Sequence, residues 1–228
     1  MTSLRRRHHT RSLPQRSRLP RAEREHQTLE AAHALFAEHG YARVTMDDVA
    51  DVVGVTKPLL YRYFGNKERL YLACMEPAGE LLTRTIVDAI TPTTNPADAL
   101  RAGLLAFFEF LDTDRDAWRV LFDETLPVSG EVAQRVAEYR DRITELVATA
   151  VLSQLPPSGR VMDRSEVEAL SAAMLGAAEA LGRWWLRGEP MPAHKAAELL
   201  ISTVEPGLRM RTGGGRSSDK TPGETDLS

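Results

Sequence analysis

The sequence predicts an all-α protein. Apolar residues recur at helical spacing in each patterned segment, and no stretch alternates apolar and polar residues as a strand does. Glycine and proline fall between these segments, where they separate one helix from the next. A hydrophobic content of 43% over 228 residues is sufficient for a buried core, so we expect one ordinary domain or a small domain joined to a larger one.

The first predicted helix runs from Glu23 to His39, and Gly40 ends it. Residues 1–20 precede it and are rich in Arg, Ser, His and Pro without an apolar period, so we expect a disordered basic arm. Residues 1–24 hold eight Arg against one Glu, although the whole chain has a net charge of −3. The arm therefore favours polyanions, whereas the rest of the chain does not.

Two very short helices follow, separated by a glycine turn. Thr45 is placed as an N-cap, with Asp48 three residues later to complete a capping box. Gly54 ends this helix after about two turns, and Thr56 is expected to cap a second helix from Lys57 to Phe64. Helices this short need tertiary packing, so together with the first helix they predict a compact three-helix unit containing a helix-turn-helix.

The remaining segments are also predicted to be helical. A fourth helix begins near Asn66 and Lys67, with a kink at Pro77. After a break at residues 91–96, the later helices are predicted at Ala99–Leu111, Arg115–Leu126, Glu131–Leu155, from a capping box of Ser165 and Glu168 to about Arg187, and at His194–Met210. The tail, residues 212–228, is expected to be disordered.

The predicted helix from Lys57 to Phe64 carries an unusual exposed surface. Leu60 and Phe64 share the face expected to pack against the core. Arg62, on the other side, has the geometry to donate hydrogen bonds to guanine in a major groove. Its neighbours are suited to contact thymine methyl groups and phosphates. Thr45 and Lys67 lie at helix N-termini, where an anion is favoured, so both are candidate phosphate contacts. The remaining residues of this surface are Lys57, Pro58, Leu59, Tyr61 and Tyr63.

Residues 23–71 resemble the N-terminal domain of the TetR family of bacterial transcriptional repressors, because the turn, the caps, the aromatic pair and the closing lysine have matching offsets. The matching residues are Ala34, Phe36, Gly40, Tyr41, Thr45, Val49, Ala50, Val53, Gly54, Val55, Thr56, Leu60, Tyr61, Tyr63, Phe64, Lys67, Glu68 and Leu70.

The resemblance implies a homodimer on a palindromic DNA operator, with a DNA-binding domain at residues 21–81 and a helical effector-binding and dimerisation domain at 82–211. It implies base-facing roles for Leu59 and Arg62. Pro58 departs mildly from the pattern, because it disfavours helical torsions at the residue before it. The implied contacts to the DNA backbone are Thr45, Thr56, Lys57, Tyr61, Tyr63 and Lys67.

The sequence of the C-terminal region has two apolar stripes at helical spacing. They fit either a dimer interface of four helices, two from each protomer, or burial within one protomer. The first contains Leu170, Ala173, Met174, Ala177, Leu181 and Trp184, and the second contains Ala197, Leu200, Ile201, Val204 and Leu208. No ligand residue is assigned; Glu179 is noted as a possible polar anchor, although a surface or ion-paired position is favoured. Plain core positions are favoured over effector contact for Phe107, Phe108, Phe110, Trp118, Phe122, Met174 and Trp185.

Several classes of function find no support in the sequence. The histidines lack metal-ligand spacing, no catalytic grouping or cofactor-binding loop is readable, and the single cysteine, Cys74, is expected to be a packed small hydrophobe. No apolar run approaches the roughly 20 residues that span a bilayer, so no membrane partner and a cytoplasmic location are expected.

We therefore expect a sequence-specific DNA-binding regulator, not an enzyme, and by the resemblance a repressor released by an unidentified small molecule. Activation remains open. The alternatives are ordinary packing of the helix pair, a helical small-molecule-binding protein or enzyme that retains the fold without DNA recognition, and a non-specific nucleic-acid binder that depends on the arm. The arm itself could also be a solubilising leader.

Overall fold

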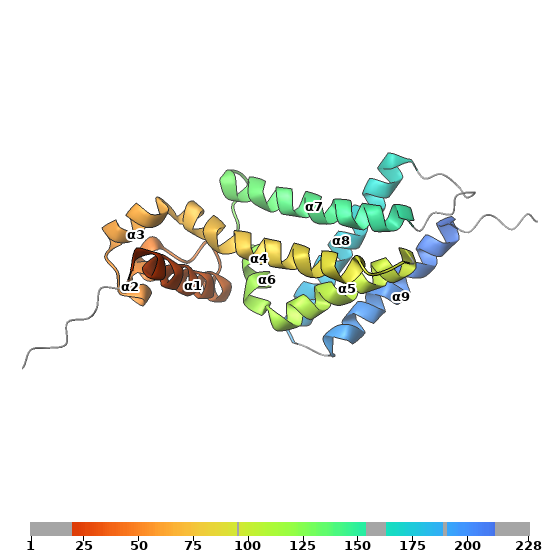
Figure 1. Cartoon of the computed structure of the whole chain (residues 1–228), viewed down its shortest axis with the longest axis horizontal. Helices are drawn as coiled ribbons and strands as arrows, with labels where there is room; N and C mark the ends of the chain where they lie inside the picture. The colour runs from red at the N-terminus through yellow and green to blue at the C-terminus, as the bar shows by residue number, and fades with distance from the viewer. Residues whose placement is uncertain (1–19, 95, 154–162, 189–190, 213–228) are drawn as a thin grey trace, which may run out of the picture.

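The described residues of the computed structural model, 20–94, 96–153, 163–188 and 191–212, form nine helices and no strand (Figure 1). The all-α prediction is confirmed for this part of the chain. No helix within these ranges is both long enough and apolar enough to cross a membrane. The helices are α1 (Arg21–His39), α2 (Met46–Val53), α3 (Lys57–Phe64), α4 (Lys67–Ile90), α5 (Pro96–Thr113), α6 (Arg115–Leu121), α7 (Glu131–Ser153), α8 (Arg164–Leu186) and α9 (Ala193–Thr212).

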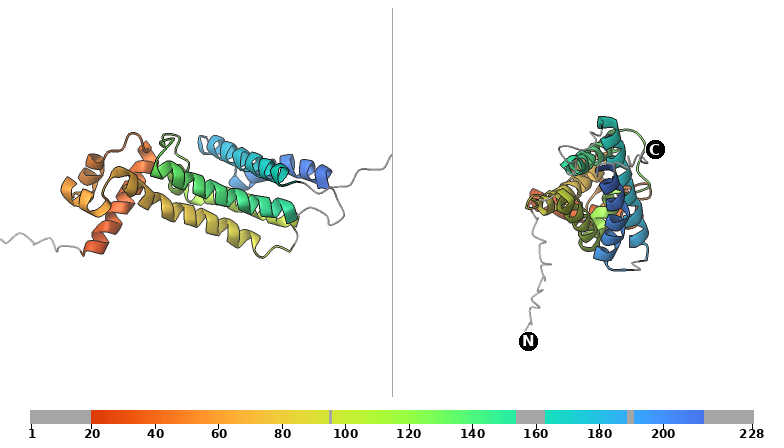
Figure 2. Two further views of the ribbon diagram at one scale, coloured as in Figure 1. Left: turned by 90° about the horizontal axis from the view of Figure 1, so that it is seen from above. Right: turned by 90° about the vertical axis from the view of Figure 1, so that its right-hand side faces the viewer.

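The molecule is elongated, with α1, α2 and α3 forming an N-terminal unit at one end (Figure 1). Helix α4 leaves this unit and packs against α5, α6 and α7 of the helical C-terminal region, and α7 lies alongside it in Figure 2. One cluster of buried side chains continues from Ala32 in α1 to Ile201 in α9. The two regions therefore share a core. The predicted boundary between residues 81 and 82 lies inside α4 and stays a prediction.

Tyr71 on α4 connects the N-terminal unit to the C-terminal region. Its ring is fully buried and lies edge-on to Phe36 and Tyr41, with ring centroids 4.9 and 5.0 Å away. Its hydroxyl donates a hydrogen bond to the carbonyl of Val120, in the last turn of α6. Since the last carbonyls of a helix have no partner within that helix, Tyr71 satisfies one of them from a different element.

The predicted extension of α6 to Leu126 is wrong, because the helix ends at Leu121. The Asp123 carboxylate accepts hydrogen bonds from the backbone N–H of Tyr41 and from that of Thr125. Aspartate often offers the backbone such an alternative to helical hydrogen bonds. The hydrogen bond from Tyr41, 82 positions away in the sequence, therefore stabilises a tight turn where the helix was predicted to continue.

The predicted capping box of α8 is also wrong. Asp163 is the N-cap, and its carboxylate accepts from the backbone N–H of Glu166 at 2.8 Å while the Glu166 side chain returns to the N–H of Asp163. Ser165 lies inside the helix and donates to Asp163, and Glu168 pairs with Arg164. A carboxylate is the stronger acceptor, so the helix begins earlier than the serine suggested.

Other helix ends differ by a few residues from the predictions. Arg21, which precedes the predicted helix start at Glu23, is the first residue of α1 and forms an ion pair of 2.7 Å with Glu25. Residues 1–19 and 213–228, predicted to be disordered, lie outside the described residues, as does the predicted end of α7 at Leu155.

The two predicted C-terminal stripes have different outcomes. On α8, Ala173 is exposed and Trp184 is 44% exposed, while Met174 belongs to the core. On α9, Leu200 and Ile201 are buried within their own protomer, and α9 packs against α5. Burial within one protomer is therefore the correct interpretation for the described part of the α9 stripe, whereas on α8 the partly buried Leu170, Ala177 and Leu181 pack against the core and only Ala173 and Trp184 of the stripe are exposed. The α8 residues that pack inward are Val167, Ser171, Met174, Leu175, Ala178, Glu179, Gly182 and Trp185.

We expect Tyr71→Phe to lower the free energy of unfolding by about 1–3 kcal/mol, because it leaves the buried Val120 carbonyl without its donor. Urea denaturation followed by circular dichroism measures this change. The control is Tyr61→Phe, since Tyr61 is 41% exposed, and its effect should stay within about 0.5 kcal/mol. Equal effects of the two substitutions would contradict the role of the Tyr71 hydroxyl.

Candidate nucleic-acid interface

A capping box fixes the start of α2, as predicted. The Thr45 hydroxyl accepts from the backbone N–H of Asp48 at 3.2 Å, and the Asp48 carboxylate accepts from the N–H of Thr45 at 2.8 Å. The Thr45 hydroxyl also donates to the Asp48 carboxylate at 2.7 Å, and this bond, followed by the bond from the Thr45 backbone N–H, lowers the pKa of Asp48. Gly54 ends α2 in the left-handed region with φ 73°, which brings α3 across α2.

Helix α3 begins at Lys57, so Pro58 does not prevent its first turn. A proline in the first turn is tolerated because the amides there have no helical partner. Thr56 occupies the predicted N-cap position, but its side chain makes no capping hydrogen bond. The N-cap position predicted for Thr56 is therefore confirmed, although the residue acts through its backbone carbonyl, which accepts from the N–H of Leu59 at 2.9 Å.

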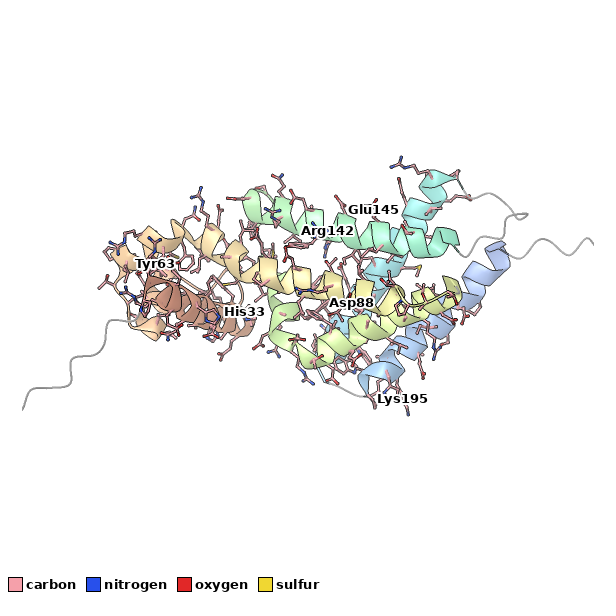
Figure 3. The ribbon with its side chains drawn as sticks, in the orientation of Figure 1. His33, Tyr63, Asp88, Arg142, Glu145 and Lys195 are labelled. Carbon is pink, nitrogen blue, oxygen red and sulfur yellow. The ribbon has the colours of Figure 1, made fainter. Side chains whose placement is uncertain are left out.

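The two faces of α3 separate largely as predicted. Leu60 is fully buried and Phe64 is half-buried against the core. Leu59 and Tyr63, which were predicted on the outer surface, are only half-buried. Figure 3 shows Tyr63 in the N-terminal unit, far from Lys195 near the start of α9. The exposed part of the candidate surface comprises Thr45, Thr56, Lys57, Pro58, Tyr61 and Arg62.

Arginines surround the Tyr63 ring. The guanidinium groups of Arg21 and Arg62 lie 5.3 and 5.9 Å from its centroid, and Phe64 meets it edge-on. Cation–π attraction of this kind holds a guanidinium near an aromatic face. The arrangement places both Arg62 and Arg21 beside Tyr63 on α3.

Both candidate lysines have a partner inside the protein. The Lys57 ammonium lies 2.8 Å from the Asp47 carboxylate at the start of α2. The Lys67 ammonium lies 4.2 Å from the centroid of the Tyr41 ring, and partial burial lowers its pKa against the opposing charges of Asp123 and Asp48. A phosphate at this surface would therefore exchange with these partners.

A second candidate site is an apolar cavity enclosed by α4, α5, α7 and α8. It consists of two adjoining pockets that share Phe107, Ile143 and Leu175. The pocket toward the end of α4 has only apolar side chains and glycine in its wall. Those residues are Ile86, Ile90, Ala99, Leu100, Gly103, Leu104, Phe107, Ile143, Leu146, Val147, Met174, Leu175 and Ala178.

The other pocket has one charged corner. Glu179 is 5% exposed, and its carboxylate lies 2.8 Å from the Arg140 guanidinium and 3.7 Å from that of Arg183. Burial raises the pKa of Glu179, while the two arginines oppose this rise. The ion-paired position favoured for Glu179 is confirmed. The pocket is lined by Met75, Gly79, Leu82, Thr83, Phe107, Leu121, Phe122, Val136, Tyr139, Arg140, Ile143, Leu175 and Glu179.

Some of the aromatic and methionine residues considered for this cavity line it, and the others do not. Phe107, Met174 and Phe122 line it, whereas the lining lacks the four others, Phe108, Phe110, Trp118 and Trp185. Most of the wall is aliphatic, and aliphatic residues on amphipathic helices give no sequence signal that separates a cavity wall from a packed core. Arg140 was missed because nothing local marks its contact with Glu179, 39 positions away.

The described part of the chain contains neither a cluster of metal ligands nor a reactive thiol. No group of three or more His, Cys, Asp or Glu side chains is placed there to hold a metal ion. Cys74 is buried, and burial raises the pKa of its thiol to about 12. It is therefore a packed small residue, as predicted, and it is a poor nucleophile.

Comparison with known proteins identifies both regions. The family model for bacterial regulatory proteins of the tetR family matches residues 29–74, and a tetracyclin repressor-like C-terminal domain matches residues 96–205. The transcriptional activator FasR of Mycolicibacterium smegmatis is 32% identical over 193 residues, covering 84% of this chain and 86% of FasR.

Two further similarities extend over most of the chain. The transcriptional repressor KstR2 of Mycobacterium tuberculosis is 24% identical over 180 residues, covering 79% of this chain and 90% of KstR2. The crystal structure of a TetR-like transcriptional regulator from Rhodococcus sp. RHA1 superposes with a TM-score of 0.69 at 32% identity. That alignment covers 84% of this chain and 98% of the Rhodococcus chain.

We expect Thr45→Ala to lower the free energy of unfolding by about 1 kcal/mol, because it removes the hydroxyl that caps α2. Denaturant unfolding measures this change, and Thr45→Ser, which keeps the hydroxyl, serves as the control. A stability loss in the serine variant as large as in the alanine variant would show that the cap is not the cause.

Proposed function

The chain belongs to the TetR family of bacterial regulatory proteins, and from this premise we propose that it represses transcription at a palindromic operator until a small apolar effector enters its C-terminal cavity. It is a DNA-binding transcriptional regulator, as its named relatives are. The operator contacts, the effector and the sign of regulation are the proposed parts.

The exposed side of α3 is the observation that carries the DNA-reading proposal. Arg62 is exposed at the middle of this surface, with the Tyr63 ring to orient it. An arginine in a major groove donates to guanine O6 and N7, whereas Pro58 and Leu59 suit thymine methyl groups. We assign the DNA-backbone contacts to Thr45, Thr56, Lys57, Tyr61, Tyr63 and Lys67.

A homodimer supports recognition of two half-sites. The uncovered side of α8 combines small residues with Trp184, and a Cβ added at Gly176 would meet only open space. Small side chains let a second helix approach closely, and an exposed tryptophan provides a large apolar contact. We propose that this side of α8, together with exposed Leu199 of α9, packs against its copy in a second protomer.

The cavity limits the class of effector. Its larger apolar part offers no polar group to a ligand, so a polar molecule would lose its hydration without replacement there. Arg140 and Glu179 supply charge at one end only. We therefore propose an apolar effector that carries a single polar or charged end near Arg140.

Repression is our proposed sign of regulation, with activation as the alternative. FasR is named as an activator and KstR2 as a repressor, so similarity alone supports either sign. A dimer bound across a promoter blocks transcription by occupancy alone, without a further contact surface. We propose no catalytic activity and no cofactor. A helical ligand-binding protein or enzyme without DNA recognition is the competing function.

The proposed function is tested by selecting bound duplexes from a random pool at near-physiological salt, and the wild type is expected to enrich one palindrome. On that operator, Arg62→Ala should weaken binding by about 1–3 kcal/mol and relax preference at one position in each half-site. Lys67→Ala should instead weaken operator and random duplexes alike, because a phosphate contact carries no base information.

Loss of equal size on operator and random duplexes for both variants would contradict this division of roles. Failure of the wild type to enrich any sequence would favour the competing function. Removal of residues 1–20 separates that result from non-specific binding through the arm, since such binding disappears with the arm.

We expect Ala180→Glu to convert the dimer into monomers and to abolish cooperative operator binding, because it places an unpaired carboxylate in the middle of the proposed α8 interface. Sedimentation velocity measures the change in mass. Ala137→Glu, at an exposed alanine on α7, is the matched control and should remain dimeric. Dimers of both variants would place the interface elsewhere.

A further inference from the structure

The turn after α6, residues 122–125, lies between the cavity and the N-terminal unit. Phe122 and the preceding Leu121 line the cavity. The Phe122 ring stacks on Trp118 with ring centroids 3.7 Å apart, which fixes it to the last turn of α6. One side of the turn is therefore in contact with the cavity.

The other side of the turn bonds to the backbone of the N-terminal unit. The Asp123 carboxylate accepts from the backbone N–H of Tyr41, and the Thr125 hydroxyl accepts from that of Ala42 at 3.1 Å. Thr125 also donates its hydroxyl proton to Asp123 at 2.7 Å, so the two side chains act together. We call Asp123 and Thr125 the clasp.

Gly40 is required for this close approach. Its φ of 77° lies in the left-handed region, and a Cβ there would lie 3.0 Å from the Thr125 hydroxyl and 3.4 Å from the Asp123 carboxylate. The sequence signal at Gly40 was interpreted only as a helix end. In the structure the same glycine also gives the clasp access to the next two amides.

The clasp is adjacent to a proposed DNA contact. Tyr41, whose amide Asp123 binds, also holds the Lys67 ammonium over its ring at 4.2 Å. The charge of Asp123 opposes the effect of burial on the pKa of Lys67. A displacement of the turn therefore changes both the position of the segment after α1 and the environment of Lys67.

A second connection joins the turn to the charged corner of the cavity. Arg183 lies 3.6 Å from Glu124 in the turn and 3.7 Å from buried Glu179. Since Glu124 is exposed, this pair alone is weak in water. Arg183 nevertheless connects the turn with Glu179, which lines the cavity.

We propose that the clasp, Asp123 and Thr125, transmits occupancy of the cavity to the DNA-binding surface, because it holds the backbone of Tyr41 and Ala42 while the cavity is empty and releases it when the cavity is filled. This inference rests on the proposed function, whose effector site is the same cavity. The clasp residues are positioning residues, because they touch neither DNA nor effector and act through the Gly40–Ala42 segment and Lys67.

The test uses a substitution that fills the cavity in place of the unidentified effector. Val136→Phe adds a ring beside Phe122, in the pocket that both residues line. It is combined with Asp123→Ala/Thr125→Val, which removes the clasp. The matched control is Asp112→Ala/Thr113→Val, since this exposed pair at the end of α5 is bonded to its own neighbourhood.

With the clasp intact, Val136→Phe is expected to weaken binding to the selected operator by 5- to 150-fold, the usual range of coupling between sites. In the clasp-free background the same substitution should change affinity by less than about 2-fold, and in the control background it should act as in wild type. An equal effect with and without the clasp would overturn the proposal, and so would no effect in the intact chain.

Hydrogen exchange without DNA separates this inference from the proposed function. The amides of Tyr41 and Ala42 should be protected in the full-length protein and should exchange faster in Val136→Phe and in the clasp-free variant. Unchanged exchange there in Val136→Phe would overturn the clasp even if operator binding is found. Faster exchange with no enriched duplex would support the clasp and count against DNA recognition. Circular dichroism melting confirms that each variant is folded.

Discussion

The structure depends on the burial of Tyr71 between the two regions of the chain. Helices α2 and α3 have eight residues each, too few to be stable without packing. Tyr71 supplies part of that packing through Phe36 and Tyr41, and its hydroxyl satisfies the end of α6. Because one side chain contacts α1, the following turn and α6, the N-terminal unit is held to α4 and α6 together. A change in the angle between α4 and α6 would therefore alter the packing of the N-terminal unit.

Sequence signals located the elements whose determinants are local. The capping box at Thr45, the left-handed Gly54 and the amphipathic pattern of α1 each act within one or two helical turns, and the structure has all of them. The faces of α3 were predicted by period alone, although the half-burial of Tyr63 depends on arginines that include one from α1. The positions that make up the candidate site could thus largely be predicted from the sequence.

What could not be predicted depends on contacts distant in sequence or on a choice between equivalent local signals. Helix α6 ends early because Asp123 bonds to Tyr41, and no local pattern marks that partner. At α8, a serine and an aspartate both had a glutamate three residues later, and only the structure shows that the carboxylate is the cap. The cavity wall is aliphatic, so its residues have the same pattern as residues of a filled core.

The charges of the N-terminal unit suggest how specific binding is separated from non-specific binding. Residues 21–70 hold nearly equal numbers of cations and acids, and Lys57 and Lys67 already have internal partners. A phosphate must compete with the Asp47 carboxylate or the Tyr41 ring, so each lysine gains less from a random duplex than a free lysine would. Arg62 is placed to add base contacts that only the operator provides. Under the proposed function, the internal pairing of the lysines therefore lowers the affinity for all DNA sequences. The difference in affinity between operator and random DNA then comes from the exposed side of α3.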